Sequence, residues 1–308
     1  MRDTFKEELI KLARRKKNLM LLTGDLGYGV FDKFEKKYPK KYLNVGVAEQ
    51  NLIGISSGLA KEGKCVICYS IANFLTLRCL EQIRNDAVYH NLNVNLVSTG
   101  GGYTYGVLGM SHHATEDLSI LNSIPNITIV APSTKWETKM SFNKLISIKG
   151  TTYLRLEKNA SDLMPSDNRK FQLGKLIKYK NGNFLAIICI GGIFNECIKA
   201  YNNSKANNSS ISIYTLSSLK PIDEIHLKNI LKKYKFIFTV EENNYLGGLG
   251  STIASIITKY SLKTKLKIFS TNDHTLKIVG DQNFLRKKIG IDHLAISSEI
   301  KKVFKFKS

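Results

Sequence analysis

The chain carries the sequence NVGVAEQNL at residues 44–52 and continues as IGISSGLA at residues 53–60. Glu49 is the one acid in this stretch, and it stands at the start of a predicted helix of small and apolar residues. A carboxylate in such surroundings is expected to leave bulk water, which costs free energy unless a partner compensates. We infer that Glu49 holds a proton for chemistry, although the helix dipole alone also favours an acid in a first turn.

Helical and strand patterns alternate on both sides of this helix. Residues 19–23 (LMLLT) and 66–69 (VICY) are continuous apolar runs, which are typical of parallel strands covered on both faces. Further strands are predicted at 94–98 and 127–130, and helices at 3–17, 48–61, 74–90, 115–123 and 135–147. This alternation predicts an α/β domain with a doubly wound sheet.

A polar, turn-rich segment near residues 160–174 separates this half from a second one. It includes the sequences NASD at 159–162 and PSDN at 165–168. Strands are predicted after it at 184–190, 210–214, 236–240 and 266–269, and helices at 194–203 and from Gly250 to about residue 260. We therefore predict two doubly wound α/β domains, residues 1–165 and 172–308, with a mobile loop at 202–210.

Length and composition fit two domains of ordinary size. The chain has 308 residues, of which 43% are hydrophobic, which is enough for two cores. No apolar run reaches the roughly 18 residues of a spanning helix. The N-terminal sequence MRDTFKEE carries charges of both signs and no apolar signal region. These features predict a cytoplasmic protein with no membrane partner.

The five cysteines form neither a disulfide framework nor a metal site. Their number is odd, and most lie in apolar runs, as reduced buried thiols do. Cys65 and Cys68 have the C-x-x-C spacing, but they fall within a predicted strand, where side chains alternate between faces. We expect the two thiols to point to opposite faces of the sheet.

The formal net charge of +21 would ordinarily indicate an acidic partner. The excess is mostly lysine scattered along the chain, and no basic motif is interleaved with aromatic residues. A phosphorylated substrate or an acidic partner subunit fits this charge better than nucleic acid does. We therefore predict no nucleic-acid partner.

Polar side chains follow strands of the first predicted sheet, where ligands of open α/β sheets bind. Asp25 follows the strand at 19–23, and Glu49 opens the next long helix. The loop GGGYTYGVLGMSHH at 100–113 follows the strand at 94–98, and so long a glycine-rich loop is uncommon unless it is functional. It ends in His112 and His113. Alternatively, Asp25 is a turn residue and the histidines are a helix-start pair.

Two further features allow more than one interpretation. Phe74 is either a core residue or a stacking face for a heterocycle. The sequence GGLG at 247–250 is similar to a phosphate-binding loop but lacks the G-x-G-x-x-G pattern. Close packing of a helix start explains it better.

Several of these segments resemble one family of thiamin-diphosphate enzymes. The sequence VGVAEQ at 45–50 resembles the segment with the cofactor-activating glutamate of transketolase and deoxyxylulose-phosphate synthase. The resemblance is to the C-terminal portion of these enzymes, a separate subunit in split transketolases, and covers nearly the whole chain. It implies a pyrimidine-binding domain followed by a transketolase C-terminal domain. Further similar segments are residues 1–5, 22–27, 74–86, 111–117, 125–132, 215–223 and 240–250.

The resemblance implies roles for the candidate residues. Glu49 matches the glutamate that bonds N1′ of the aminopyrimidine ring of thiamin diphosphate, and that ring takes the proton from C2 of the thiazolium. Phe74 matches the aromatic residue stacked on the pyrimidine, and Leu77 or Leu80 could share this contact. His112 matches a histidine near the substrate oxygen.

The remaining positions concern the substrate. Arg2 aligns with an arginine that binds substrate phosphate, His113 replaces a glutamine, and Asp25 is a further candidate contact. Gly100 and Leu108 stand where split transketolases have a histidine and an aspartate that contact sugar hydroxyls. This departure leaves the donor and the acceptor open.

The resemblance also implies a partner. The family binds the diphosphate and Mg²⁺ through a G-D-G run followed by an Asn-Asn pair, whereas this chain has Gly24-Asp25-Leu26 and no such pair in the first domain. We therefore expect an N-terminal transketolase-like subunit to carry the diphosphate-binding domain and the metal site, in an α2β2 assembly.

These observations predict a subunit of a heteromeric, thiamin-diphosphate-dependent transketolase-like enzyme. It would transfer a two-carbon ketol or acyl carbanion unit between sugar phosphates or to an aldehyde acceptor. The alternatives are the β subunit of an α-keto-acid dehydrogenase, an enzyme similar to deoxyxylulose-phosphate synthase, and a non-catalytic interaction subunit.

Overall fold

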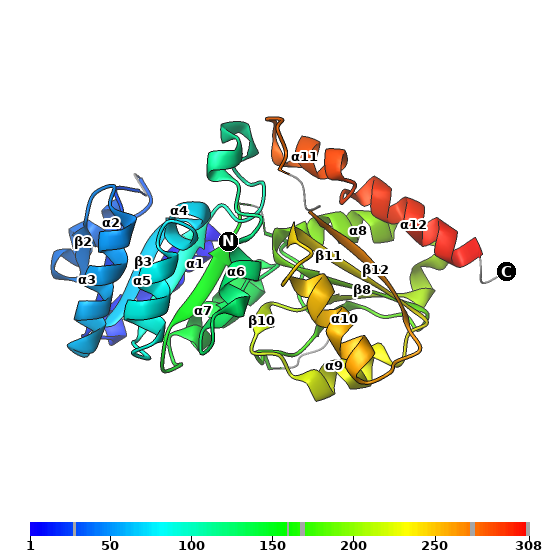
Figure 1. The fold of residues 1–308 in the computed structure, drawn as a ribbon, viewed down its shortest axis with the longest axis horizontal. Coiled ribbons are helices and arrows are strands. Elements are labelled where there is room, and N and C mark those ends of the chain that lie inside the picture. The colour runs from blue at the N-terminus through cyan, green and yellow to red at the C-terminus, as the bar shows by residue number, and fades with distance from the viewer. Residues whose placement is uncertain (27–28, 159, 167–169, 272–274, 306–308) are drawn as a thin grey trace.

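The computed structural model describes residues 1–26, 29–158, 160–166, 170–271 and 275–305. It contains two α/β domains that lie side by side, as the sequence predicts (Figure 1). Gly27, from the first-strand segment, and Asn159, Asp167 and Asn168, from the predicted boundary turns, lie outside the described residues.

The first domain is built on a seven-stranded sheet with the order β10-β5-β6-β4-β3-β1-β2. Its first six strands along the chain pair in parallel. They are β1 (Leu19–Thr23), β2 (Tyr42–Asn44), β3 (Cys65–Ile71), β4 (Val94–Thr99), β5 (Thr128–Val130) and β6 (Thr152–Leu156). The seventh, β10 (Ser218–Lys220), comes from the second half of the chain and pairs antiparallel with β5.

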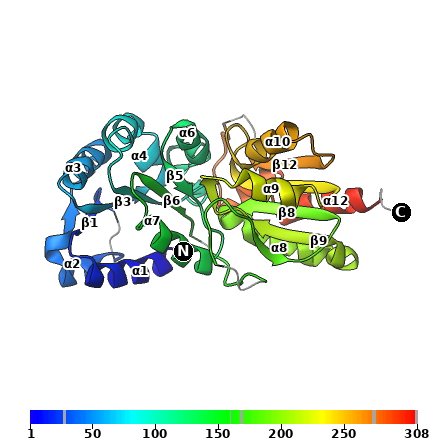
Figure 2. The same ribbon diagram turned by 90° about the horizontal axis from the view of Figure 1, so that it is seen from below.

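Helices cover both faces of this sheet, which explains why strands such as β1, β3 and β4 are largely apolar and buried. One face carries α3 (Glu49–Lys61), α4 (Ala72–Thr76), α5 (Leu80–Gln82) and α6 (Asp117–Ser123). The other carries α1 (Arg2–Arg15), α2 (Asp32–Lys37) and α7 (Lys135–Leu145) (Figure 2). Cys65 packs in the core under α1 and α7, and Cys68 packs in the core under α3. The two thiols therefore face opposite sides of β3, as predicted.

The second domain has a five-stranded sheet with the order β12-β11-β8-β9-β7. Its strands are β7 (Ile177–Lys180), β8 (Leu185–Ile190), β9 (Ile211–Thr215), β11 (Phe236–Asn244) and β12 (Lys265–Thr271), with only β7 antiparallel to its neighbour. One face carries α9 (Glu224–Leu231) and α10 (Leu249–Lys259), and the other carries α8 (Phe194–Asn203) and α12 (His293–Lys305). The helix α11 (Gln282–Ile289) lies beside a loop of the first domain (Figure 1).

The two domains share buried contacts. One apolar cluster includes Leu118 of α6 together with Leu227 and Ile253 of the second domain. Glu137 of α7 is fully buried and accepts hydrogen bonds from the Tyr179 hydroxyl (2.6 Å) and the Thr215 hydroxyl (2.7 Å). Both apolar packing and buried hydrogen bonds therefore join the domains.

The structure departs from the predicted elements in places that have physical causes. The predicted helix at 74–90 is broken into α4, α5 and the π-helix η2 (Ile83–Val88). The predicted polar loop at 202–210 contains the end of α8 at Asn203 and a 3₁₀ helix at Lys205–Ser210. Strand β6 was not predicted, because its sequence TYLRL contains a charge, although Arg155 is fully buried.

In the described part of the chain, no helix is both long and apolar enough to cross a membrane.

Candidate active site

Glu49 is the first residue of α3, and its side chain is only 1% exposed. An Arg78 Nη1–H donates to its Oε2 at 2.6 Å. Gly24, just after β1, lies beside it: a Cβ there would be in ordinary van der Waals contact with Glu49 Cγ, at 3.6 Å. The buried acid expected from the sequence is thus present, and the guanidinium is the charge that compensates its burial.

Arg78 connects Glu49 to the aromatic candidate. The Arg78 guanidinium lies over the Phe74 ring, 4.5 Å from its centre, and is itself 45% exposed. Such a cation–π contact is attractive, most of all where water is excluded. Arg78 was not predicted from the sequence, although an arginine four residues after a phenylalanine in a predicted helix was a signal for this contact.

His112 approaches the same ring from the loop after β4. Its imidazole stands edge-on to Phe74, with the two ring centres 5.1 Å apart. The Ser111 hydroxyl lies 3.0 Å from His112 Nδ1, and the Asn73 amide donates to the Ser111 carbonyl oxygen at 2.7 Å. The loop is therefore tied to α4, and the structure brings Glu49, Phe74 and His112 into one connected group.

The departures from the split-transketolase pattern lie in this loop. Gly100 has a left-handed φ of +88°, and a Cβ there would collide with the Tyr105 ring. Tyr105 also lies edge-on to His112, at 6.5 Å between ring centres. Leu108 is 54% exposed on the same loop, with Val107 and Met110 exposed beside it. An aromatic ring therefore contacts His112, and exposed apolar side chains precede it along the loop.

Two other predicted residues flank the group. Leu77 is exposed one residue before Arg78. Asp25 has a left-handed φ of +55° directly after β1, and its backbone N–H donates to Asn44 Oδ1 at 2.8 Å. The Asn44 amide in turn donates to Asp25 Oδ1 at 3.0 Å, which holds this carboxylate near the start of the Glu49 segment.

Two more predicted residues, His113 and Arg2, come from the same loop and from the start of α1. The His113 ring is 2% exposed and packs edge-on against Tyr103 at 5.0 Å. Burial lowers the pKa of His113, so its imidazole is neutral at neutral pH. Arg2 is exposed at the start of α1, next to Met1, whose sulfur accepts the Glu157 N–H after β6. Their roles as substrate contacts stay predictions.

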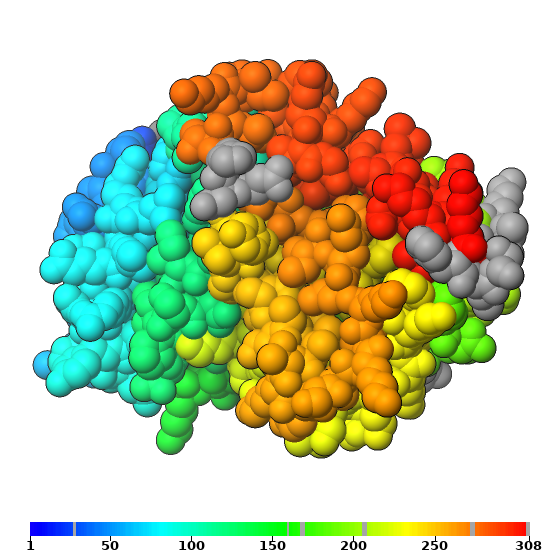
Figure 3. All heavy atoms as spheres, turned by 45° about the vertical axis from the view of Figure 1, so that its right-hand side comes forward, coloured from blue at the N-terminus to red at the C-terminus, as the bar shows by residue number. Residues whose placement is uncertain are grey.

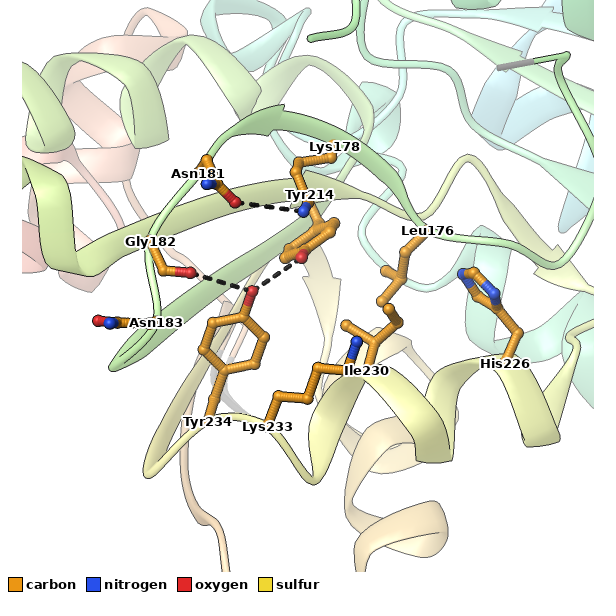
Figure 4. Close-up of a pocket in the computed structure, with 10 residues that line it drawn as sticks. All are labelled: Leu176, Lys178, Asn181, Gly182, Asn183, Tyr214, His226, Ile230, Lys233 and Tyr234. Carbon is orange, nitrogen blue, oxygen red and sulfur yellow. Dashed lines mark hydrogen bonds between the residues drawn. The ribbon is translucent and has the colours of Figure 1, made fainter. Parts of the chain in front are cut away.

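A cavity in the second domain lies apart from this group of residues. In the described ranges, no three His, Cys, Asp or Glu side chains are grouped closely enough to hold a metal ion. A cavity of about 290 Å³ lies in the second domain between β7, β9 and α9 (Figure 4). Its wall includes Tyr214 and Tyr234, whose hydroxyls are 2.8 Å apart. None of the residues singled out from the sequence lines it.

Comparison with known protein families gives this group of residues a context. Residues 1–162 match the family described as transketolase, pyrimidine binding domain, and residues 174–291 match the family described as transketolase, C-terminal domain. The chain belongs to the transketolase family.

Individual relatives agree with this assignment. The transketolase-family chain is 36% identical, over 97% of its length and 95% of the relative, to a protein described as a transketolase C-terminal section from Methanocaldococcus jannaschii. It is 32% identical, over 84% of its length and 83% of the relative, to one of the subunits of apulose-4-phosphate transketolase from Actinobacillus succinogenes. A solved structure described as a split-gene transketolase in an inactive β4 tetramer superposes with a TM-score of 0.87 at 27% identity, covering 100% of this chain and 99% of that one.

Proposed function

We propose that this chain is the pyrimidine-binding subunit of a cytoplasmic, heteromeric transketolase-like enzyme that depends on thiamin diphosphate. Residues 1–165 would hold the pyrimidine end of the cofactor, and residues 172–308 would form the C-terminal domain. The observation that carries the proposal is the buried Glu49 at the start of α3, grouped with Phe74 and His112. The enzyme would transfer a two-carbon ketol or acyl carbanion unit to an aldehyde acceptor.

The residues present fit the pyrimidine end of thiamin diphosphate. When bound, the cofactor supplies a C2 carbon that becomes nucleophilic on losing its proton. Glu49 would bond N1′ of the aminopyrimidine ring and stabilise the form that takes this proton, while Phe74 offers the face of its ring. Arg78 covers both groups, so cofactor binding would require this half-exposed side chain to move away from them.

His112 would serve the substrate. It is half-buried, its ring contacts the same Phe74 ring that Arg78 covers, and its Nδ1 lies next to the Ser111 hydroxyl. An imidazole placed there can donate a hydrogen bond to a substrate oxygen or move a proton to it. We assign Arg2, Asp25 and His113 to the same substrate region, with Leu77 at the cofactor side.

A separate subunit would complete the site. Related chains are named as single subunits of a transketolase, and the split-gene relative is described as inactive in its β4 form. These names support a partner that supplies the diphosphate-binding domain and Mg²⁺, in an α2β2 assembly. The positive net charge of +21 is suited to an acidic partner or a phosphorylated substrate.

The proposal is tested by the exchange of the C2 proton of thiamin diphosphate for deuterium, followed by NMR in the assembled complex. Glu49→Gln keeps the shape of the side chain but removes its charge, so we expect exchange to slow by about 10²- to 10⁴-fold. The matched control is Glu62→Gln, at the exposed end of the same helix, which should exchange at the wild-type rate. Wild-type exchange in Glu49→Gln would reject the proposal.

A further inference from the structure

The loop that carries His112 rests directly on the second domain. We call residues 100–114 the site loop. A Cβ at Gly102, which has a φ of +60°, would lie 2.6 Å from Glu242 Cγ, and a Cβ at Gly106 would lie 2.5 Å from both the Gly280 carbonyl oxygen and Leu285 Cδ1. The glycines of the site loop thus let its backbone touch β11 and the α11 region. In Figure 3, the orange segment with α11 lies against the teal residues of the first domain at the top of the molecule.

Glu242 of β11 is the polar contact between this backbone and the second domain. Its side chain is fully buried, and its Oε1 accepts the backbone N–H of Tyr103 at 2.9 Å. The Gln282 amide donates to both carboxylate oxygens, at 2.9 and 3.1 Å, and Arg286 Nε donates to Oε2 at 3.1 Å. One carboxylate therefore binds donors from both the site loop and α11.

Tyr103 is connected to the segment that carries His112 by backbone hydrogen bonds and a ring contact. Gly102 and Ala114 exchange two backbone hydrogen bonds, of 2.8 and 3.0 Å, which close the base of the site loop. The Tyr103 ring packs edge-on against His113, the residue next to His112. A shift of Tyr103 therefore moves the segment that carries the imidazole.

We propose that Glu242 is a positioning residue: the second domain holds the site loop, and through it His112, by the carboxylate of Glu242. The inference rests on the proposed function, because it assigns His112 to the reaction. The C-terminal domain would then take part in catalysis through the site loop. It would not need to contact Glu49, Phe74 or His112 directly. A misplacement of a catalytic group by about 1 Å can cost about 10²-fold in rate.

The neighbouring glutamate provides a matched control. Glu241 is also fully buried on β11, but its carboxylate accepts the N–H groups of Leu249 (2.8 Å) and Gly250 (2.7 Å) at the start of α10. It therefore serves the second domain. Replacing either glutamate by glutamine removes one buried carboxyl group from the same strand, but only one of the two changes affects the site loop.

The experiment compares Glu242→Gln with Glu241→Gln in the full chain and in the assembled complex. In Glu242→Gln, the new amide nitrogen cannot accept a hydrogen bond, so either the Tyr103 N–H or Arg286 loses its acceptor. We expect faster hydrogen–deuterium exchange within residues 102–114 and a kcat lower by about 10²-fold, with the affinity for thiamin diphosphate unchanged. Glu241→Gln should leave all three quantities at wild-type values.

A second variant guards against a failure of Glu242→Gln to fold. Gln282→Ala removes the amide that steadies both Glu242 oxygens and that also donates to the Thr104 hydroxyl of the site loop at 3.5 Å, but it leaves every charge in place. It should raise exchange in the site loop and lower kcat several-fold. Wild-type loop exchange and kcat in both variants, or equal losses in Glu241→Gln, would overturn the inference. An inactive wild-type complex would instead reject the proposed function, while loop exchange would still decide whether Glu242 holds the loop.

Discussion

The two ends of the candidate site are held in different ways. At the cofactor end, Glu49 starts a regular helix, and its partner Arg78 belongs to the same domain. At the substrate end, His112 sits on a loop whose backbone rests on Glu242 of the second domain. The proposed cofactor end is thus built from local elements of one domain, whereas the proposed substrate end depends on how the two domains pack. The cofactor end should tolerate changes in the second domain, and the substrate end should not.

Among the changes that test this comparison, the largest loss of stability should come from Arg155→Met. Arg155 lies beneath the site loop at Gly101. Its guanidinium is fully buried and donates to Asp117 (3.0 Å) and to Glu157 (3.2 Å). Arg155→Met would leave both carboxylates buried without this partner, and we expect the free energy of unfolding to fall by about 3–5 kcal/mol. Urea unfolding of the purified chain measures this change.

The matched control for Arg155 is Lys135, whose ion pair with Asp162 is exposed. Lys135→Met should change the free energy of unfolding far less than Arg155→Met does, because water screens an exposed ion pair. A loss in Arg155→Met no larger than in this control would show that the buried network does not stabilise the fold.

A smaller effect on the free energy of unfolding is expected from pH, through Glu241 of the second domain. Burial raises the pKa of Glu241 from 4.5 to about 7, although hydrogen bonds from Gly250 and Leu249 oppose the shift. The folded state therefore binds more protons than the unfolded state between these two values. The contribution of Glu241 to stability is present below about pH 4.5 and is lost as the pH rises to about 7.

Comparison of wild type with Glu241→Gln measures this contribution. Between pH 4.5 and 7, the free energy of unfolding of wild type relative to the variant should fall by about 1–3 kcal/mol. Chemical unfolding at several pH values gives the difference. A difference that stays constant or rises over this range would contradict the assignment.

Phe74 joins the two ends of the site, because its ring contacts both Arg78 and His112. Phe74→Ala should weaken binding of thiamin diphosphate to the assembled complex by about 2- to 10-fold, the loss of one aromatic contact of about 0.5–1.5 kcal/mol. Calorimetric titration of the complex measures the affinity. An unchanged Kd would remove Phe74 from the cofactor site.

The smallest effect is expected at Leu77, which is exposed at the edge of the group. Leu77→Ala should change the same Kd by less than Phe74→Ala does, because Leu77 offers the cofactor an exposed aliphatic side chain and no ring face. A larger loss in Leu77→Ala would mean that the pyrimidine contacts this residue instead of Phe74.

Much of this arrangement could be predicted from the sequence, because it depends on local patterns. The apolar strands, the start of α3 at Glu49 and the long glycine-rich loop were each readable from neighbouring residues. Arg78 was not, because its approach to Glu49 follows from the break between α4 and α5 in what looked like one helix. Arg155 and Glu242 were missed because their roles come from contacts between distant segments, and charge in a strand usually indicates exposure.

The central claim is that this chain supplies one half of a thiamin-diphosphate site and needs a partner for the other half. The measurement that tests it most directly is calorimetric titration of thiamin diphosphate with Mg²⁺ into the chain alone and into its mixture with an N-terminal transketolase-like subunit that forms a complex with it. The account predicts binding in the mixture and none by the chain alone. Tight binding by the chain alone, or no binding by a mixture that forms a stable complex, would contradict it.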